Sequence, residues 1–297
     1  MNVLLLGADY YGTLAAARAY GRAGVRVVMA EDNPQARGLY SRFVAEKLTH
    51  PPLSDPNALI DWLVDYGKAH PDTLLYPPND HLAWLYAAHR TRLDQHFAMF
   101  SPPEDAVFKL LDKKRLHDAC ARVGIDVPTT LALADLAIES TQVKSVPFPV
   151  LLKPRTQVYL TSGIKGFIAH DHHELADELK RFEELVAFDR VLTERHPDVS
   201  EPMLQEYLTA AETSIFSVSG FVTLDGDIVA RGAMKVLQRP RKVGIGLCFE
   251  GRPVEEPLVE KLGALCKSIG YHGAFESEFI VYGKKRLLID FNPRFYS

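Results

Sequence analysis

Cysteine is scarce in this sequence of 297 residues, which contains only Cys120, Cys248 and Cys266. Their number is odd and no two of them form a CxxC pair, so the sequence shows no disulfide framework. Scattered cysteines of this kind fit a reducing cytosol, where they serve as small buried hydrophobic side chains. We therefore expect a cytoplasmic protein.

An excess of positive charge and long hydrophobic runs are also missing. The net charge is −4 and the pI is near 6.3, which argues against a nucleic-acid partner. The apolar start, residues 3–6, reaches Gly7 after four residues without a basic flank, so we expect neither a signal peptide nor a membrane partner. Hydrophobic residues make up 47% of the chain, enough for two or three packed layers.

The sequence lacks a complete dinucleotide-binding loop. Residues 7–12 read G-A-D-Y-Y-G rather than G-x-G-x-x-G, and Asp9 replaces the middle glycine that would admit a pyrophosphate. A tight strand-to-helix turn is the favoured interpretation. The alternative is an NAD-dependent Rossmann oxidoreductase in which Glu31 or Asp32 binds the ribose.

The first hundred residues predict a small doubly wound α/β domain that ends near residues 101–103. Its strands are expected at 3–6, 25–29 and 73–76, and its helices at 13–22, 57–68 and 80–90. The remaining two-thirds predict an α+β region. Its helices are expected at 104–123, interrupted at 112–113, and at 174–184 and 257–269; its strands at 150–153, 203–208, 214–223, 227–236, 273–281 and 286–291.

The most informative stretch is 273–296, G-A-F-E-S-E-F-I-V-Y-G-K-K-R-L-L-I-D-F-N-P-R-F-Y. It predicts a hairpin turning at residues 283–285, with Glu278 opposite Asp290 and Glu276 opposite Asn292. Clustered carboxylates repel one another unless a cation lies between them, and carboxylate and amide oxygens suit Mg²⁺. The opposite face is expected to be apolar and to contain Phe275, Phe279, Val281, Leu287, Ile289 and Phe291.

Several cations occur where a core residue would otherwise stand. Lys153 ends the apolar strand 150–153, and Pro154 and Arg155 follow it. Loops like the small, hydroxyl-rich stretch 161–166 can close over phosphates through backbone N–H groups. The stretch 231–246 predicts an anion clamp next to the carboxylates; it includes Lys235, Arg239, Arg241 and Lys242.

Two further segments have weaker signals. Residues 204–212 run from an apolar strand into a polar turn, and their exposed backbone is suited to pairing with a purine edge. The histidines of 170–173 precede a helix, and we expect Asp171 or a neighbour to cap that helix rather than the histidines to bind metal.

Taken in order, these segments resemble the ATP-grasp superfamily, and in particular its carboxylate–amine ligase and carbamoyl-phosphate-synthase-like group, to which the D-aspartate ligases belong. The resemblance covers nearly the whole chain. It implies an N-terminal Rossmann-like pre-ATP-grasp domain (1–104), a central ATP-grasp lobe with a phosphate-covering loop (105–208) and a C-terminal lobe with the metal site (209–297).

The resemblance also implies roles for individual residues. Lys113 and Lys153 would contact the phosphates, and Lys153 and Arg294 would be the catalytic residues. Residues 161–166, with Ser162, Gly163 and Lys165, would cover the β- and γ-phosphates. Residues 205–208 would form an adenine-binding hinge that includes Gln205, with the backbone of Glu206 and Leu208 reading the base. Glu212 would hold the ribose hydroxyls, and Lys235 would also bind the nucleotide. Glu278, Asp290 and Asn292 would bind Mg²⁺ (or Mn²⁺).

The implied function is ATP- and Mg²⁺-dependent activation of a carboxylate as an acyl phosphate, followed by attack of an amine or another nucleophile. The partners would be small molecules, with homo-oligomerisation left open. A non-catalytic nucleotide-binding subunit is a third alternative. The chain departs from the superfamily in carrying Asp290 where Glu is more common. It also stops five residues after Asn292, where relatives usually continue with a helix, which implies a truncated or a minimal lobe.

Overall fold

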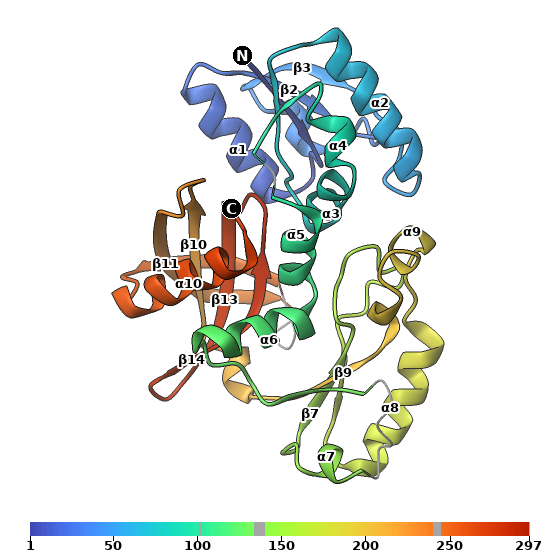
Figure 1. The fold of residues 1–297 in the computed structure, drawn as a ribbon, viewed down its shortest axis with the longest axis vertical. Helices are drawn as coiled ribbons and strands as arrows, with labels where there is room; N and C mark the ends of the chain where they lie inside the picture. The colour runs from blue at the N-terminus through green and yellow to red at the C-terminus, as the bar shows by residue number, and fades with distance from the viewer. Residues whose placement is uncertain (101, 134–139, 240–244, 297) are drawn as a thin grey trace.

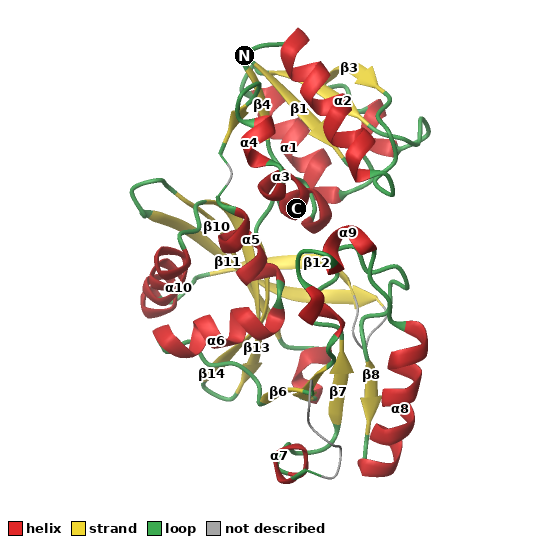
Figure 2. Cartoon of the chain, turned by 45° about the vertical axis from the view of Figure 1, so that its right-hand side comes forward, coloured by secondary structure: helices red, strands yellow, loops and turns green. Residues whose placement is uncertain are grey.

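The computed structural model describes residues 1–100, 102–133, 140–239 and 245–296, and its described strands form three sheets. Figures 1 and 2 show a parallel-sheet region at the N-terminal end, an antiparallel region with α8 at the opposite end, and a second antiparallel region beside the long helical connection. The predicted mixture of α/β and α+β architecture is confirmed. Arg241 and Lys242 of the predicted anion clamp lie outside the described residues.

The N-terminal sheet is parallel and has the strand order β3-β2-β1-β4-β5. Helices begin where side chains cap them: Asp55 accepts from Ala58 N–H, and Asn79 accepts from Leu82 N–H. The elements are β1 (Asn2–Leu6), α1 (Tyr11–Arg22), β2 (Arg26–Ala30), β3 (Val44–Leu48), α2 (Pro56–Ala69), β4 (Thr73–Leu75), α3 (Asp80–Ala88), α4 (Arg90–Leu93) and β5 (Ala98–Met99).

Two helices connect this region to the rest of the chain, and they break where the sequence predicts. Asp112 has an extended backbone and caps α6 by accepting from the N–H groups of Lys114 and Arg115. The central sheet that follows has the order β6-β9-β7-β8, with α8 packed against it. Its elements are α5 (Glu104–Leu111), α6 (Lys113–Val123), β6 (Thr130–Ala132), α7 (Thr141–Lys144), β7 (Val150–Lys153), β8 (Phe167–Ala169), α8 (His172–Leu185), α9 (Arg190–Thr193) and β9 (Met203–Glu206). Asp171 caps α8, as predicted.

The C-terminal sheet is antiparallel, with the order β12-β11-β10-β13-β14. Apolar side chains of α6 and α10 share one core with residues of β10, β13 and β14. One face of this sheet is therefore covered by helices, and part of the other lines the cavity described below. The elements are β10 (Ile215–Val222), β11 (Ile228–Arg239), β12 (Ile245–Arg252), α10 (Glu256–Ile269), β13 (Gly273–Tyr282) and β14 (Lys285–Asn292).

The C-terminal segment docks onto the N-terminal region. Phe295 N–H donates to Pro77 O at 3.2 Å, and the Phe295 ring lies 4.5 Å from the Tyr76 ring, centroid to centroid. Gly273 makes room for Tyr76: its φ is +123°, and a Cβ there would stand 2.5 Å from the Tyr76 hydroxyl. These contacts fix the position of Arg294 relative to α3.

The hairpin has the predicted pairing at the site but a different turn. Glu278 lies opposite Asp290 and Glu276 opposite Asn292, as expected. The turn, however, consists only of Gly283 and Lys284, because Tyr282 already pairs with Lys285, and a register shift after Glu278 restores the pairing at the site. The predicted apolar face is wrong at two positions: Leu288 enters the helix-covered core, whereas Leu287 and Ile289 belong to a separate apolar cluster with Ile280.

Candidate functional site

A cavity of about 200 Å³ lies between the central and C-terminal sheets. Its walls come from both sheets, from the first residue of α6 and from the loop after β7. The lining residues are Lys113, Leu151, Lys153, Gln157, Lys165, Gln205, Glu206, Tyr207, Leu208, Ala211, Ile215, Lys235, Gln238, Glu278, Ile280, Ile289 and Asp290. A smaller cavity of about 170 Å³ adjoins it, sharing Ile215, Lys235 and Gln238 and adding Glu212.

The structure brings most of the predicted site residues together here. Nine of them line the larger cavity: Lys113, Lys153, Lys165, Gln205, Glu206, Leu208, Lys235, Glu278 and Asp290. Glu212 lines the adjoining cavity. Ser162, Gly163, Asn292 and Arg294 line neither of these two cavities. The site therefore gathers residues that the sequence spreads over six separate segments.

Two carboxylates of the site are paired with lysines. Lys113 Nζ donates to Asp290 Oδ1 at 2.8 Å, and Lys235 Nζ lies 2.6 Å from Glu278 Oε1. Burial alone would raise the pKa of Asp290, but Lys113 holds that pKa below its usual value. The sequence predicts repulsion between Glu278 and Asp290. In the structure, each of these carboxylates is instead neutralised by a lysine ammonium group from another element.

Lys153 has a different kind of partner. Its Nζ donates to the amide oxygen Oε1 of Gln205 at 2.7 Å, and both side chains are buried. Burial and the nearby charge of Lys113 lower the pKa of Lys153 to about 7, against the opposing effect of Asp290. The Gln205 side chain therefore contacts a lysine, whereas the sequence places this residue in an adenine-binding hinge.

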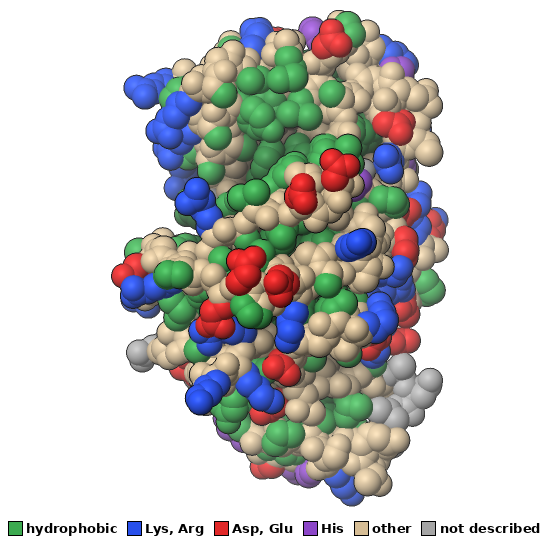
Figure 3. All heavy atoms as spheres, turned by 60° about the vertical axis from the view of Figure 1, so that its left-hand side comes forward, with side chains coloured by type: hydrophobic (Ala, Val, Ile, Leu, Met, Phe, Trp, Pro, Cys, Tyr) green, Lys and Arg blue, Asp and Glu red, His purple; other side chains and the backbone are tan. Residues whose placement is uncertain are grey.

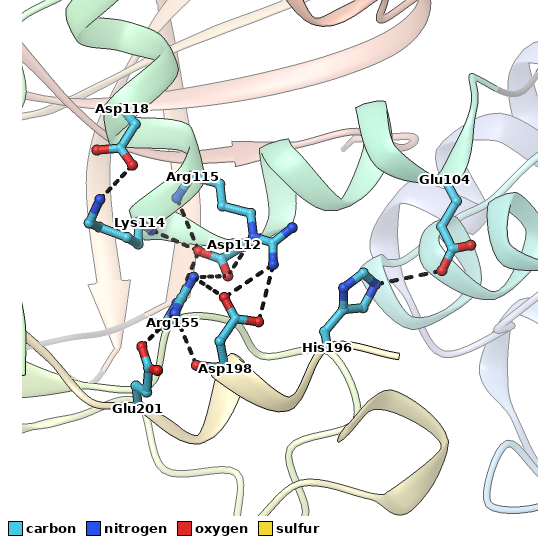
Figure 4. A network of polar contacts seen from close by, with 9 residues as sticks. All are labelled: Glu104, Asp112, Lys114, Arg115, Asp118, Arg155, His196, Asp198 and Glu201. Carbon is cyan, nitrogen blue, oxygen red and sulfur yellow. Dashed lines mark hydrogen bonds and ion pairs between the residues drawn. The ribbon is translucent and has the colours of Figure 1, made fainter. Parts of the chain in front are cut away.

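Arg155 does not line the cavity beside Lys153 as a second cation. Its side chain is only 4% exposed and lies within an acidic cluster, shown in Figure 4. Arg155 Nη2 lies 2.8 Å from Asp112 Oδ2 and 2.9 Å from Asp198 Oδ2, and Nη1 donates to Glu201 Oε2 at 3.0 Å. The carbonyl of Arg155 also accepts from Lys113 N–H at 2.8 Å. Arg155 thus ties the start of α6 to the end of β7, so it fixes Lys113 relative to Lys153.

Arg294 is held by a residue that sequence reasoning missed. Its Nε donates at 2.7 Å to Asp80 Oδ1, at the start of α3 in the N-terminal region. Burial opposes the charge of Arg294, but Asp80 raises its pKa above the usual value. Asp80 lies 214 positions away in sequence, and no local pattern links it to Arg294.

Other lining residues were also missed, and the signals for them differ. Leu151 and Ile280 stand two positions from Lys153 and Glu278 on the same strands, so strand periodicity could have found both. Ile289 reaches the cavity because of the register shift in the hairpin, which the sequence does not reveal. Tyr207 could have been predicted from the sequence, because it lies inside the predicted hinge. Its hydroxyl donates to Glu212 Oε1 at 3.1 Å.

The predicted metal ligands fit Mg²⁺ that arrives with a polyphosphate. Glu278 and Asp290 are cross-strand neighbours. Glu276, which is not one of the predicted ligands, lies two residues before Glu278 on the same strand, and burial together with the charge of Glu278 raises its pKa to about 7. Among the described residues, no three His, Cys, Asp or Glu side chains form a group that could hold a metal by themselves. Proteins commonly bind Mg²⁺ through one or two carboxylates plus substrate phosphates, so this donor set is compatible with it.

Lysines and carboxylates at a cavity between two sheets agree with the resemblance to ATP-grasp enzymes, and so does comparison with known proteins. No protein-family model matches the chain. The chain is 23% identical over 294 residues to the large chain of carbamoyl phosphate synthase from Clostridium perfringens (strain SM101), covering 96% of this chain and 25% of that protein. It thus spans about a quarter of the length of this relative.

Solved structures show the same fold. A biotin carboxylase from Campylobacter jejuni, in complex with β,γ-ATP, superposes with a TM-score of 0.77 at 17% identity, over 99% of this chain and 66% of that one. N5-carboxyaminoimidazole synthetase from Staphylococcus aureus, complexed with ADP, gives a TM-score of 0.68 at 15% identity, over 100% of this chain and 71% of that one. The expected resemblance to the carbamoyl-phosphate-synthase-like ATP-grasp enzymes is confirmed.

Proposed function

We propose that the chain binds ATP with Mg²⁺ in the cavity between the two sheets and activates a carboxylate as an acyl phosphate for attack by an amine. The observation that carries this proposal is the convergence of Lys113, Lys153, Lys165 and Lys235 on one cavity that also contains Glu278 and Asp290. Four cations facing two carboxylates match the charges of a polyphosphate and its metal ion.

The proposed roles follow from position. Leu151, Ile215 and Ile280 form an apolar wall for the adenine, with the backbone of Glu206 and Leu208 at the base edge. Glu212, next to the cavity, would contact the ribose. Lys113, Lys153 and Lys235 would bind the phosphates, with Lys165 and the neighbouring Ser162 and Gly163 covering them.

The chemistry would take place between Arg294 and the carboxylates. When bound on Glu278, Asp290 and Asn292, Mg²⁺ (or Mn²⁺) would neutralise charge that develops on the transferred phosphoryl group. Arg294, oriented by Asp80, would help to stabilise the same charge. The amine would then displace phosphate from the acyl phosphate. This step needs no side-chain nucleophile.

The domain assignment is part of the same proposal. We assign residues 1–104 to a Rossmann-like pre-ATP-grasp domain, 105–208 to the central lobe and 209–297 to the C-terminal lobe. The parallel order β3-β2-β1-β4-β5 supports the first assignment, and the two antiparallel sheets support the others.

Among the described residues, no helix is both long and apolar enough to cross a bilayer. The cytoplasmic assignment rests on the cysteine usage. On the face shown in Figure 3, acidic and basic side chains both occur.

The structure disfavours an NAD-binding oxidoreductase. In the first loop, Ala8 N–H donates to Glu31 Oε2 at 2.6 Å, and Asp9 accepts from Arg37 N–H at 3.0 Å. A Cβ on Gly12 would lie 3.0 Å from Phe295 O, so the C-terminal segment covers that end of the loop. A pyrophosphate would therefore have to displace existing contacts.

Thermal unfolding with nucleotides tests the proposal. At 100 times its dissociation constant, Mg²⁺–ATP should stabilise the protein by about 2.7 kcal/mol, which raises Tm by roughly 5 °C. NAD should leave Tm unchanged. Lys153→Met tests whether the ATP shift arises from binding in this cavity. It removes one phosphate-binding cation and should therefore lose most of the increase in Tm with ATP. A shift with NAD and none with Mg²⁺–ATP would reverse the assignment.

Turnover separates the ligase from a non-catalytic nucleotide-binding subunit. ADP release should appear when the correct carboxylate and amine are offered together, and a screen of amino acids and small carboxylates would find them. A protein that binds Mg²⁺–ATP but releases no ADP with any pair would support the non-catalytic alternative.

A further inference from the structure

Gln205 is built into the site next to Lys153. Gln205 lies on β9, where it pairs with Leu151 of β7, so it stands diagonally across from Lys153 on the neighbouring strand. The 2.7 Å bond from Lys153 Nζ to Gln205 Oε1 joins two side chains that are 6% and 4% exposed. The contact is thus set by the strand register and shielded from water.

A chain of hydrogen bonds fixes the orientation of the Gln205 amide. Gln205 Nε2 donates to Thr130 Oγ1 at 3.3 Å, and Thr130 Oγ1 donates to Pro128 O at 2.8 Å. Because the Thr130 hydroxyl gives its proton to a carbonyl, it can only accept from Gln205. The amide nitrogen must therefore face Thr130, which leaves the amide oxygen for Lys153.

The neutrality of this partner distinguishes Lys153 from Lys113 and Lys235, which line the same cavity. Lys113 and Lys235 each have a carboxylate within 3 Å, whereas Lys153 forms no ion pair among the described residues. The charged and titratable groups around it are Lys113 and His117 on α6 and Asp290 on β14. Burial lowers the pKa of His117 to about 3, so its ring is neutral near pH 7.

We infer that Gln205 is a positioning residue: its amide oxygen holds the Lys153 ammonium in place and, being uncharged, leaves the full charge of that ammonium to the bound nucleotide. This inference rests on the proposed function, because it requires a polyphosphate in the cavity. A glutamate at the same position would have the same shape but would neutralise Lys153 before any phosphate arrived.

Proton uptake gives a readout that a merely structural role would not change. Since the pKa of Lys153 is about 7, the side chain is partly deprotonated at pH 7.5 in the free protein. Phosphate binding should raise that pKa, so Lys153 should take up roughly 0.5 to 1 proton per nucleotide. In Gln205→Glu the new carboxylate keeps Lys153 protonated beforehand, and this uptake should disappear.

The experiment is calorimetric titration of the full chain with ADP and Mg²⁺ at pH 7.5, in two buffers of different ionisation enthalpy. Glu276, whose pKa is about 7, also titrates in this range, so the informative quantity is the difference between wild type and variant. Relative to wild type, Gln205→Glu should take up about 0.5 to 1 proton less and bind about tenfold more weakly. Gln205→Met, which has no acceptor, should also bind more weakly but keep the proton uptake.

Gln157→Glu is the matched control for added negative charge. Gln157 lines the same cavity, but its amide donates to Ile164 O at 3.4 Å rather than contacting a lysine. This variant should bind ADP more weakly while keeping the wild-type proton uptake. If Gln205→Glu and Gln157→Glu match in both quantities, or if Gln205→Glu behaves as wild type, the role of Gln205 is refuted. Failure of the wild type to bind ADP would instead refute the proposed function itself.

Discussion

Replacing Arg155 with methionine is expected to lower the free energy of unfolding by about 3–5 kcal/mol, as removal of one partner of a buried ion pair typically does. The Asp112 side chain is fully buried, and Arg155 is 4% exposed. Methionine has similar length and fills the space, but it leaves the Asp112 carboxylate without its closest cation. Urea unfolding at pH 7 measures the change.

Arg115 provides the control within the same network. It also contacts Asp198, at 3.1 Å, but its side chain is 32% exposed. Arg115→Met should therefore cost less than about 1 kcal/mol. Equal effects of the two substitutions, or a negligible effect of Arg155→Met, would show that the acidic cluster does not depend on Arg155.

Arg155 should also matter for nucleotide binding, although it lies outside the cavity. Its carbonyl accepts from Lys113 N–H, and Lys153 precedes it by two residues. Arg155→Lys keeps the charge but not the planar fork, so it should fold yet bind Mg²⁺–ADP more weakly than wild type. The loss should shrink in a Lys113→Met background, because Arg155 would act through Lys113.

Replacing Asp290 with asparagine should lower the stability of the nucleotide-free protein, by about 1–3 kcal/mol. If Glu278 and Asp290 repelled each other, the substitution would relieve that repulsion and raise the stability. Lys113 Nζ, however, lies 2.8 Å from Asp290 Oδ1, so the substitution removes an ion pair instead. Because the pKa of Asp290 in the folded state is below its usual value, the stabilisation is present at neutral pH and is lost as the pH falls through that pKa. The difference between wild type and variant should therefore begin to shrink only below about pH 4 and should disappear once the pH is below the lowered folded-state pKa of Asp290.

Nucleotide binding by the same variant separates metal binding from lysine pairing. Asp290→Asn should weaken Mg²⁺–ATP binding at least about tenfold, since it removes a charged ligand. In EDTA, ATP binding should be unchanged or tighter, because Lys113 is no longer held by a carboxylate and is available to phosphate. Asp118→Asn, which removes the partner of Lys114 on the exposed side of α6, should change neither affinity. Wild-type Mg²⁺–ATP affinity in Asp290→Asn would eliminate Asp290 as a metal ligand.

The sequence by itself determined the local elements and part of the site. The extended backbone at Asp112 that ends α5 and caps α6, the cap at Asp171 and the pairing of Glu278 with Asp290 all follow from short patterns. The sequence did not predict the strands β3, β5, β6, β8 and β12, and each of them lies at the edge of its sheet. In β3 and β12, charged and small residues also interrupt the apolar alternation.

Only the tertiary structure decided which partner each charged side chain has. Lys113 and Asp290 are 177 positions apart, and Arg294 and Asp80 are 214 apart, so no window of sequence contains both members of either pair. Arg155 illustrates the consequence. A cation after an apolar strand suggests phosphate binding, but the packing of α6 places the Asp112 carboxylate next to Arg155, and the two side chains form an ion pair. Periodicity specifies which face of an element is buried, but the chemistry of a side chain depends on the element that packs against that face.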